Sequence, residues 1–175
     1  MEYSQTPVFK GTYRHKMDPK GRLPVPAPFR RVLAAQGAAV VVVTLLDECL
    51  AAYPPAEWAR LEVQLGALPA FSRPVKALTR LLTSRAADCE LDGQGRILLP
   101  PTLRVATGLL REVVVVGVLN RFEVWRPDAW ASFLKDSERL LDDVSLDLQW
   151  PLPPAPPTPG EGPSRPTHPQ GKPNR

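Results

Sequence analysis

Short apolar runs, separated by Gly, Pro and charged residues, recur along the chain in two similar series. Residues 40–43 and 113–116 are runs of four valines, and β-branched side chains favour strands. Each run is followed by another strand-like segment, which ends near Tyr53 in the first series and near Trp125 in the second. This pattern predicts a mainly β protein.

Helices are expected between and after these strands. Pro28 and Pro101 occupy positions typical of a helix start, and Gly37 and Gly108 occupy positions typical of a helix end. Further helices are predicted after the prolines that follow each last strand, and these carry Trp58 and Trp130. A connecting helix is indicated by apolar residues at helical spacing, namely Phe71, Val75, Leu78 and Leu82.

The two series are copies of one unit. Each copy contains the motif D-x-x-G-R, and the second motif lies 74 residues after the first. Five residues of the first copy align with five of the second: Asp18, Gly21, Arg22, Pro26 and Arg30 with Asp92, Gly95, Arg96, Pro100 and Arg104. The valine runs and the tryptophans continue the alignment with small offsets. A collinear pattern of this kind indicates an internal duplication.

Neither copy has enough strands to enclose a core without leaving open edges. We therefore expect the two copies to pair around a pseudo-two-fold axis in one barrel-like body. The predicted organisation is a first repeat over residues 8–60, a helical connector over 61–84, and a second repeat with a C-terminal helix over 85–147. The Pro-rich tail, residues 151–175, is predicted to be disordered because it has too few apolar residues to form a core.

The charge distribution modifies this picture. Hydrophobic residues make up 43% of the 175 residues, which is enough for a core, and the formal net charge is only +4. Between Met1 and Arg31, however, seven basic residues stand against two acidic ones. Such a concentration is typical of a surface that faces phosphate, but also of a basic edge that resists aggregation. Charge alone leaves both interpretations open.

Other function classes find little support. The two cysteines lack metal-site spacing and the two histidines are isolated, so we expect no metal, no disulfide framework and no cofactor. No apolar run approaches the ~20 residues that span a bilayer, and the basic N-terminal segment lacks the apolar stretch of a signal peptide. The sequence predicts a soluble, cytoplasmic protein.

The two turns are the strongest candidates for chemistry. Two symmetry-related aspartates could suggest an aspartic protease, but Asp18 is followed by Pro19 and Lys20, and no nucleophile–base set occurs. We therefore predict no enzymatic activity. Each Asp can instead pair with the Arg across its turn and fix the loop. Arg22 and Arg96 could in addition donate hydrogen bonds to guanine or bind phosphate.

These motifs and the extensions GRLPVPAPFR and GRILLPPTLR resemble the MraZ family of bacterial regulators, over about residues 8–145. That family is related more distantly to the AbrB and SpoVT regulators. The resemblance implies a double-split β-barrel with flanking α-helices, assembled into a ring-shaped homo-oligomer. It also implies binding to repeated elements of double-stranded promoter DNA in the nucleoid. The usual role is repression of the protein's own division and cell-wall gene cluster.

The resemblance assigns DNA contacts to the turns. Matching positions are Lys20, Arg22 and Arg96, and the basic residues before the first turn add Arg14 and Lys16. The structural turn residues are Asp18, Gly21, Asp92 and Gly95. The second turn has Gln94 in place of Lys20 and follows an acidic segment, so the two turns are predicted to be unequal. The alternative is an AbrB-like interaction module or antitoxin that does not act on promoters.

Overall fold

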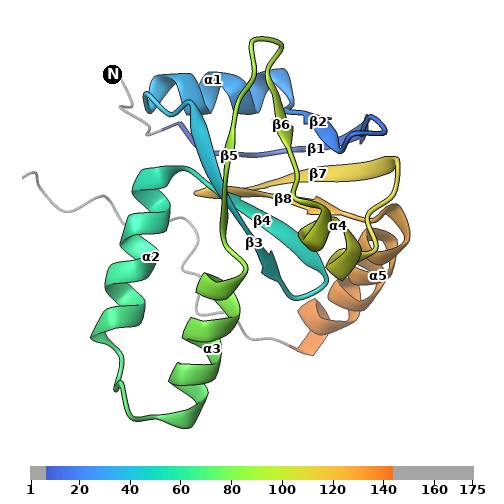
Figure 1. Ribbon diagram of the computed structural model, residues 1–175. Coiled ribbons are helices and arrows are strands. Elements are labelled where there is room, and N and C mark those ends of the chain that lie inside the picture. The colour runs from blue at the N-terminus through green and yellow to red at the C-terminus, as the bar shows by residue number, and fades with distance from the viewer. Residues whose placement is uncertain (1–6, 144–175) are drawn as a thin grey trace, which may run out of the picture.

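The computed structural model describes residues 7–143 (Figure 1). The first half contains β1 (Thr12–Lys16), β2 (Arg22–Pro24), α1 (Ala27–Ala35), β3 (Val40–Leu46), β4 (Cys49–Tyr53) and α2 (Pro55–Ala67). The second half contains α3 (Arg73–Ser84), β5 (Ala87–Glu90), β6 (Arg96–Leu98), α4 (Pro101–Thr107), β7 (Glu112–Val118), β8 (Arg121–Trp125) and α5 (Pro127–Asp143). The expected mainly β fold with flanking helices is confirmed.

The strands form two antiparallel sheets that interleave the repeats. One has six strands in the order β1-β7-β8-β4-β3-β5, and the other is a two-stranded ribbon of β2 and β6. Strands from different repeats pair at β1–β7, β8–β4, β3–β5 and β2–β6. The strand order of the large sheet is symmetric about the β4–β8 pair, and the ribbon pairs the equivalent strands β2 and β6. The two copies therefore build one body, as the duplication predicts.

The ribbon is joined to both edges of the large sheet. The edge strands β1 and β5 are the strands that lead into β2 and β6 through the two D-x-x-G-R turns. Hydrogen bonds cross each turn, from Asp18 N to Arg22 O at 3.0 Å and from Asp92 N to Arg96 O at 2.8 Å. Sheet and ribbon thus enclose one core, while closure into a single continuous barrel stays a prediction.

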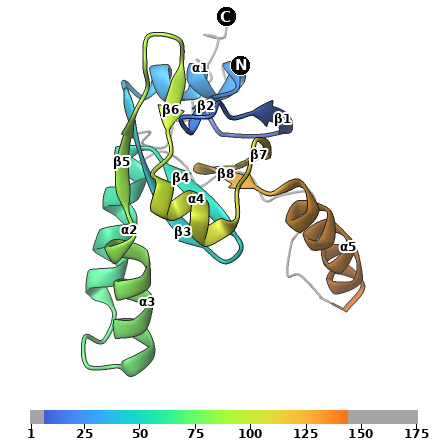
Figure 2. The ribbon, with the colours of Figure 1, turned by 45° about the vertical axis from the view of Figure 1, so that its right-hand side comes forward.

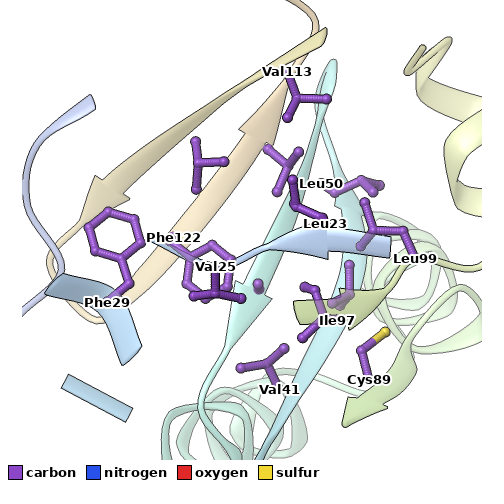
Figure 3. Close-up of a cluster of buried hydrophobic side chains, with 14 of the residues drawn as sticks. Leu23, Val25, Phe29, Val41, Leu50, Cys89, Ile97, Leu99, Val113 and Phe122 are labelled. Carbon is purple, nitrogen blue, oxygen red and sulfur yellow. The ribbon is translucent and has the colours of Figure 1, made fainter. Parts of the chain in front are cut away.

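Side chains from both repeats fill this core. Leu23 and Ile97 of the ribbon are fully buried against the large sheet (Figure 3). Phe29 of α1 packs on Phe122 of β8, with ring centroids 5.6 Å apart. Burying each large side chain of this kind stabilises the fold by roughly 1.5–3 kcal/mol. Because both copies contribute side chains to this core, the packing of each copy depends on the other.

The valine strands and two tryptophans are core residues, as predicted. The valines of β7 face both sides, and Val113 and Val115 lie in the main core. Trp58 of α2 and Trp125 of β8 are buried in two smaller clusters on the outer face of the sheet. These clusters attach α2 and α5 to the sheet. Figure 2 shows α2 at the left of the molecule and α5 at the right.

The connecting helix differs from its prediction at its first residue. Helix α3 begins at Arg73, so Phe71 lies before it and is 92% exposed. The preceding proline-containing turn, which ends α2, interrupts the helical periodicity. Of the four predicted apolar residues only Leu82 is buried. The carbonyl oxygen of Leu82 accepts a 2.7 Å hydrogen bond from Thr44 Oγ1. That bond ties α3 to β3.

The remaining expectations about organisation concern boundaries. The predicted repeat limits stay a prediction, and the predicted disordered tail, residues 151–175, lies outside the described residues. None of the helices within residues 7–143 combines the length and apolarity required to cross a bilayer.

Candidate nucleic-acid interface

The first turn is fixed by the carboxylate of Asp18. Its Oδ1 atom accepts hydrogen bonds from the backbone N–H groups of Lys20 at 3.0 Å and Arg22 at 2.9 Å. Its Oδ2 atom accepts one from Arg22 Nε. These bonds, led by the backbone N–H of Arg22, lower the pKa of Asp18. Gly21 completes the turn with φ of +88°, a conformation that favours glycine.

The second turn repeats this arrangement. Asp92 Oδ1 accepts from the backbone N–H groups of Gln94 at 2.9 Å and Arg96 at 3.0 Å. Asp92 Oδ2 accepts from Arg96 Nε at 2.8 Å and lies 2.8 Å from Arg96 Nη2. The backbone N–H of Arg96 is the main cause of the lowered pKa of Asp92. Both aspartates therefore have the geometry of loop-fixing residues.

The side chains of the two turn arginines differ in their exposure to solvent. Arg22 and Arg96 each donate to their aspartate through Nε, and among residues 7–138 the terminal nitrogens of neither arginine donate a further hydrogen bond to the protein. Arg96 Nη2 also lies 2.8 Å from Asp92 Oδ2. The side chain of Arg22 is 38% exposed and that of Arg96 is 24% exposed. Arg22 is the better placed of the two to contact a ligand.

The ribbon brings the two arginines onto one face. Leu23 and Ile97 point into the core, so their strand neighbours Arg22, Arg96 and Leu98 point outward. In the ribbon Arg22 is opposite Leu98, and Arg96 is opposite Pro24. The arginines are thus offset by two residues, or about 7 Å along the strands.

The basic residues of the first repeat are divided between surfaces. Lys20 is exposed at the tip of the first turn. Arg14 lies directly opposite Val114 in the β1–β7 pair. Val114 belongs to the buried cluster that attaches α5 to the sheet, so Arg14 lies on that outer face of the sheet. Arg14 also lines a hollow together with Pro127 at the start of α5. Arg14 therefore points away from the outer face of the ribbon that carries Arg22.

Lys16 lies between the hollow that Arg14 lines and the first turn. It is at the end of β1, opposite Glu112, and its Nζ atom is 3.7 Å from Glu112 Oε1. It lines the hollow near Arg14 and also a groove beside the first turn. Of the residues predicted before the turn, Lys16 is the one that the structure brings close to Asp18.

Two further arginines support the turns, and each belongs to the opposite repeat. Arg104 of α4 lies against Gly21, and Arg30 of α1 lies against Gly95. Arg104 Nε donates to the carbonyl oxygen of Leu99 at 3.1 Å, and Arg30 Nη1 donates to that of Val25 at 2.9 Å. Their aligned positions in the two copies are a sequence signal, but sequence spacing does not reveal that each one crosses to the other turn.

Within the described part of the chain, the two cysteines and His15 make no hydrogen bond to the residues of the turns. Cys49 and Cys89 are buried free thiols, and burial is the main cause of their raised pKa values. Burial, followed by the charge of Arg30, lowers the pKa of His15. Among the side chains of residues 7–138, no three of His, Cys, Asp or Glu are grouped in a way that could hold a metal ion.

The sequence is similar to one family of known proteins. The sequence matches the family described as "MraZ protein, putative antitoxin-like" over residues 8–81 and again over residues 82–145. A protein of Ligilactobacillus salivarius named "Transcriptional regulator MraZ" is 44% identical over 141 residues, which cover 81% of this chain and 96% of the relative. Proteins of the same name from Limosilactobacillus reuteri and Halothermothrix orenii are 45% and 39% identical, each over 81% of this chain and 97% of the relative. These names describe regulators of transcription and not enzymes, in agreement with the sequence prediction.

Proposed function

The chain belongs to the MraZ family, and on that basis we propose that it is a sequence-specific DNA-binding transcription regulator. The observation that carries the proposal is the outer face of the β2–β6 ribbon, which carries both Arg22 and Arg96, offset from each other by two residues along the strands. The relatives named as transcriptional regulators support the same function. The proposed DNA contacts are Lys20, Arg22 and Arg96, with Lys16 at the flank.

The geometry of the ribbon suits DNA in shape and charge. The major groove of B-DNA is about 12 Å wide and admits a two-stranded β-ribbon. A guanidinium group can donate two hydrogen bonds to the O6 and N7 atoms of guanine. Asp18 holds Arg22 through Nε, which leaves its terminal nitrogens available for such a contact. Lys20, at the tip of the turn, is suited to a backbone phosphate.

The finer part of the proposal concerns assembly and the target. We propose that the protein forms a ring-shaped homo-oligomer that binds repeated elements in the promoter of its own division and cell-wall gene cluster, and represses it. One protomer presents only a small contact face, so its affinity for a single element would be low. When several protomers of a ring engage several elements, the later contacts are intramolecular and the affinity rises. Such a protein would act in the cytoplasm, associated with the nucleoid.

Footprinting on the DNA upstream of the protein's own gene tests the proposal. We expect the unmodified protein to protect several regularly spaced elements. The double variant Arg22→Ala/Arg96→Ala should lose this protection while keeping its fold, as judged by circular dichroism. An unchanged footprint with the double variant would refute the proposed contact residues. Light scattering tests the assembly, since a monomer at micromolar concentration would contradict the ring.

An antitoxin-like module is the second candidate, because the description of the matching family includes that term. AbrB-type antitoxins usually carry one copy of the motif and dimerise, whereas this chain carries both copies. Co-purification of a small toxin, together with failure to bind the upstream DNA, would favour this second function. Retention on the upstream DNA without a bound protein would favour regulation.

A further inference from the structure

A groove beside the first turn combines residues from both repeats. Its volume is about 710 Å³, and it is lined by Lys16, Asp18 and Pro19 of the first repeat and by Arg104, Leu110 and Arg111 of the second. In Figure 1 the first turn and the connection between α4 and β7 lie along the same edge of the molecule. We call this the first-turn groove.

Backbone contacts hold the basic residues of the groove in place. The backbone N–H of Met17 donates to the carbonyl oxygen of Arg111 at 2.7 Å. Lys16 pairs with Glu112 in the β1–β7 ladder, so Lys16 and Arg111 occupy neighbouring positions at the open end of that strand pair. On the other wall, Arg104 Nε is held by the carbonyl oxygen of Leu99. Three cationic side chains thus line the groove, from strand β1, helix α4 and the connection between α4 and β7.

The nearby acidic groups do not cancel these charges. The carboxylate of Asp18 already accepts three hydrogen bonds inside its own turn and is paired with Arg22. Glu112 is 3.7 Å from Lys16, and both side chains are 66% exposed, so this ion pair is weak and can be exchanged for another anion. Among residues 7–138, whose side chains the structure describes, Arg104 and Arg111 have no carboxylate partner within ion-pair distance. The groove therefore carries excess positive charge.

The groove depends on a difference between the two repeats. Val40 lies three residues after Gly37, whereas Val113, its counterpart, lies five residues after Gly108. The longer connection includes Arg111. At the second turn, the position equivalent to Lys16 is Glu90, which would repel an anion. The basic groove is thus a feature of the first turn and not a necessary consequence of the repeated fold.

We propose that the first-turn groove binds a backbone phosphate of DNA, with Lys16, Arg104 and Arg111 as its contacts. This inference rests on the proposed function and extends it: the second repeat supplies cationic side chains to the DNA surface of the first turn. Guanidinium groups bind phosphate through paired hydrogen bonds. Phosphate contacts set the position of a protein on the duplex without reading its sequence. The groove would therefore hold the duplex in register while Arg22 reads a base.

Salt-dependent binding of the full chain tests the inference. The probes are two fluorescein-labelled duplexes, one covering the DNA upstream of the protein's own gene and one of unrelated sequence. The variants are Arg111→Ala and Lys16→Ala, which change exposed side chains. The control is Arg73→Ala, which removes the same charge at the start of α3, at the far end of the α2–α3 hairpin (Figure 1).

Loss of one phosphate contact has a defined signature. Affinity falls as salt rises, and Arg111→Ala should make this fall less steep, reducing the size of the slope of log affinity against log salt concentration by about 1. It should also weaken binding to both duplexes by about fivefold to tenfold near 0.1 M salt. Arg111→Lys should restore most of the slope, because it keeps the charge. Arg73→Ala should leave both the slope and the affinity close to those of the unmodified protein.

Two outcomes would overturn the inference and are distinguishable from each other. If Arg111→Ala and Lys16→Ala behave like Arg73→Ala while Arg22→Ala weakens binding, the groove is not a phosphate site and the proposed function stands. If the unmodified protein binds neither duplex at any salt concentration, both the groove proposal and the proposed function fail. Arg104→Ala is not used as the primary variant, because Arg104 also supports Gly21.

Discussion

A Cβ atom added at Gly21 would lie 2.7 Å from Nε and Cζ of Arg104. Gly21 belongs to the turn of the first repeat and Arg104 to the helix of the second. The symmetric contact joins Gly95 and Arg30, where an added Cβ would lie 2.4 Å from Arg30 Cδ. Each turn is therefore packed against an arginine of the other repeat, so the geometry of each turn depends on correct assembly of the two copies.

Substitution of Gly21 should destabilise the protein for two reasons. Its φ of +88° disfavours any residue with a side chain, and the guanidinium group of Arg104 would have to shift to make room for the new methyl group. We expect Gly21→Ala to lower the free energy of unfolding by about 1–3 kcal/mol, measured by urea denaturation. The control is Gly93→Ala in the second turn, where an added Cβ meets nothing within 4 Å. Equal effects of the two substitutions would contradict the packing argument.

The contact between Gly21 and Arg104 predicts energetic coupling. In the Arg104→Ala background no guanidinium group has to shift, so Gly21→Ala should cost less than it does in the unmodified protein. A double-mutant cycle should give a coupling energy of about 0.5–3 kcal/mol, as for other residues in contact. Additive effects, with a difference below about 0.5 kcal/mol, would show that backbone strain alone explains the Gly21 effect.

The two turn arginines should contribute unequally to DNA binding. The side chain of Arg22 is 38% exposed and that of Arg96 is 24% exposed, and Arg96 Nη2 lies 2.8 Å from Asp92 Oδ2. We expect Arg22→Ala to cost about 1–3 kcal/mol of discrimination between target and unrelated DNA, and Arg96→Ala to cost less. Fluorescence anisotropy with both duplexes measures this, with thermal unfolding as a check on folding. A larger effect for Arg96→Ala would reverse the assignment.

Acid should weaken the contribution of the turn aspartates. The pKa of Asp18 is lowered from its ordinary value of 3.8, mainly by the backbone N–H of Arg22. Its stabilising effect is therefore complete above the ordinary pKa and is lost as the pH falls through the lowered one. The stability difference between the unmodified protein and Asp18→Asn should stay constant near neutral pH and shrink in acid. Urea denaturation across this pH range measures it, and a difference that grew in acid would contradict the hydrogen-bond pattern.

The two thiols should be inert in the folded protein. Cys89 is 3% exposed, and burial followed by the charge of Asp88 raises its pKa to about 11. Cys49 is 1% exposed and its pKa is also raised, mainly by burial. Because the thiolate is the reactive form, a colorimetric disulfide reagent should react with neither thiol in mildly alkaline buffer, and with both in urea. Rapid reaction of one thiol in the native state would contradict this burial.

Local chemistry was predictable from the sequence. The hydrogen bonds of each D-x-x-G-R turn join residues at most four positions apart, so residue types and spacing are sufficient to indicate them. The valine strands were predictable for a similar reason, because β-branched side chains favour extended backbone and buried faces. The duplication also indicated that the two copies share a core.

Periodicity was less reliable in the connector. Phe71 continues the apolar spacing of α3, but the helix starts two residues later, at Arg73, and Phe71 is exposed. A periodic pattern carries no information on whether the predicted face has a partner. The rest of the chain decides this, because α3 contacts the sheet mainly near its C-terminal end, where Leu82 is buried.

By itself the sequence determined the repeated turns, the strand-forming segments and the basic character of the first turn, since each depends on residues close together in the chain. The tertiary structure alone decided which repeat supports which turn, that Arg14 points away from Arg22, and that Arg111 lies beside Lys16. These relationships depend on strand pairing between residues about a hundred positions apart, as in the β1–β7 ladder. Register in that ladder sets which face each side chain occupies, and no local spacing records it.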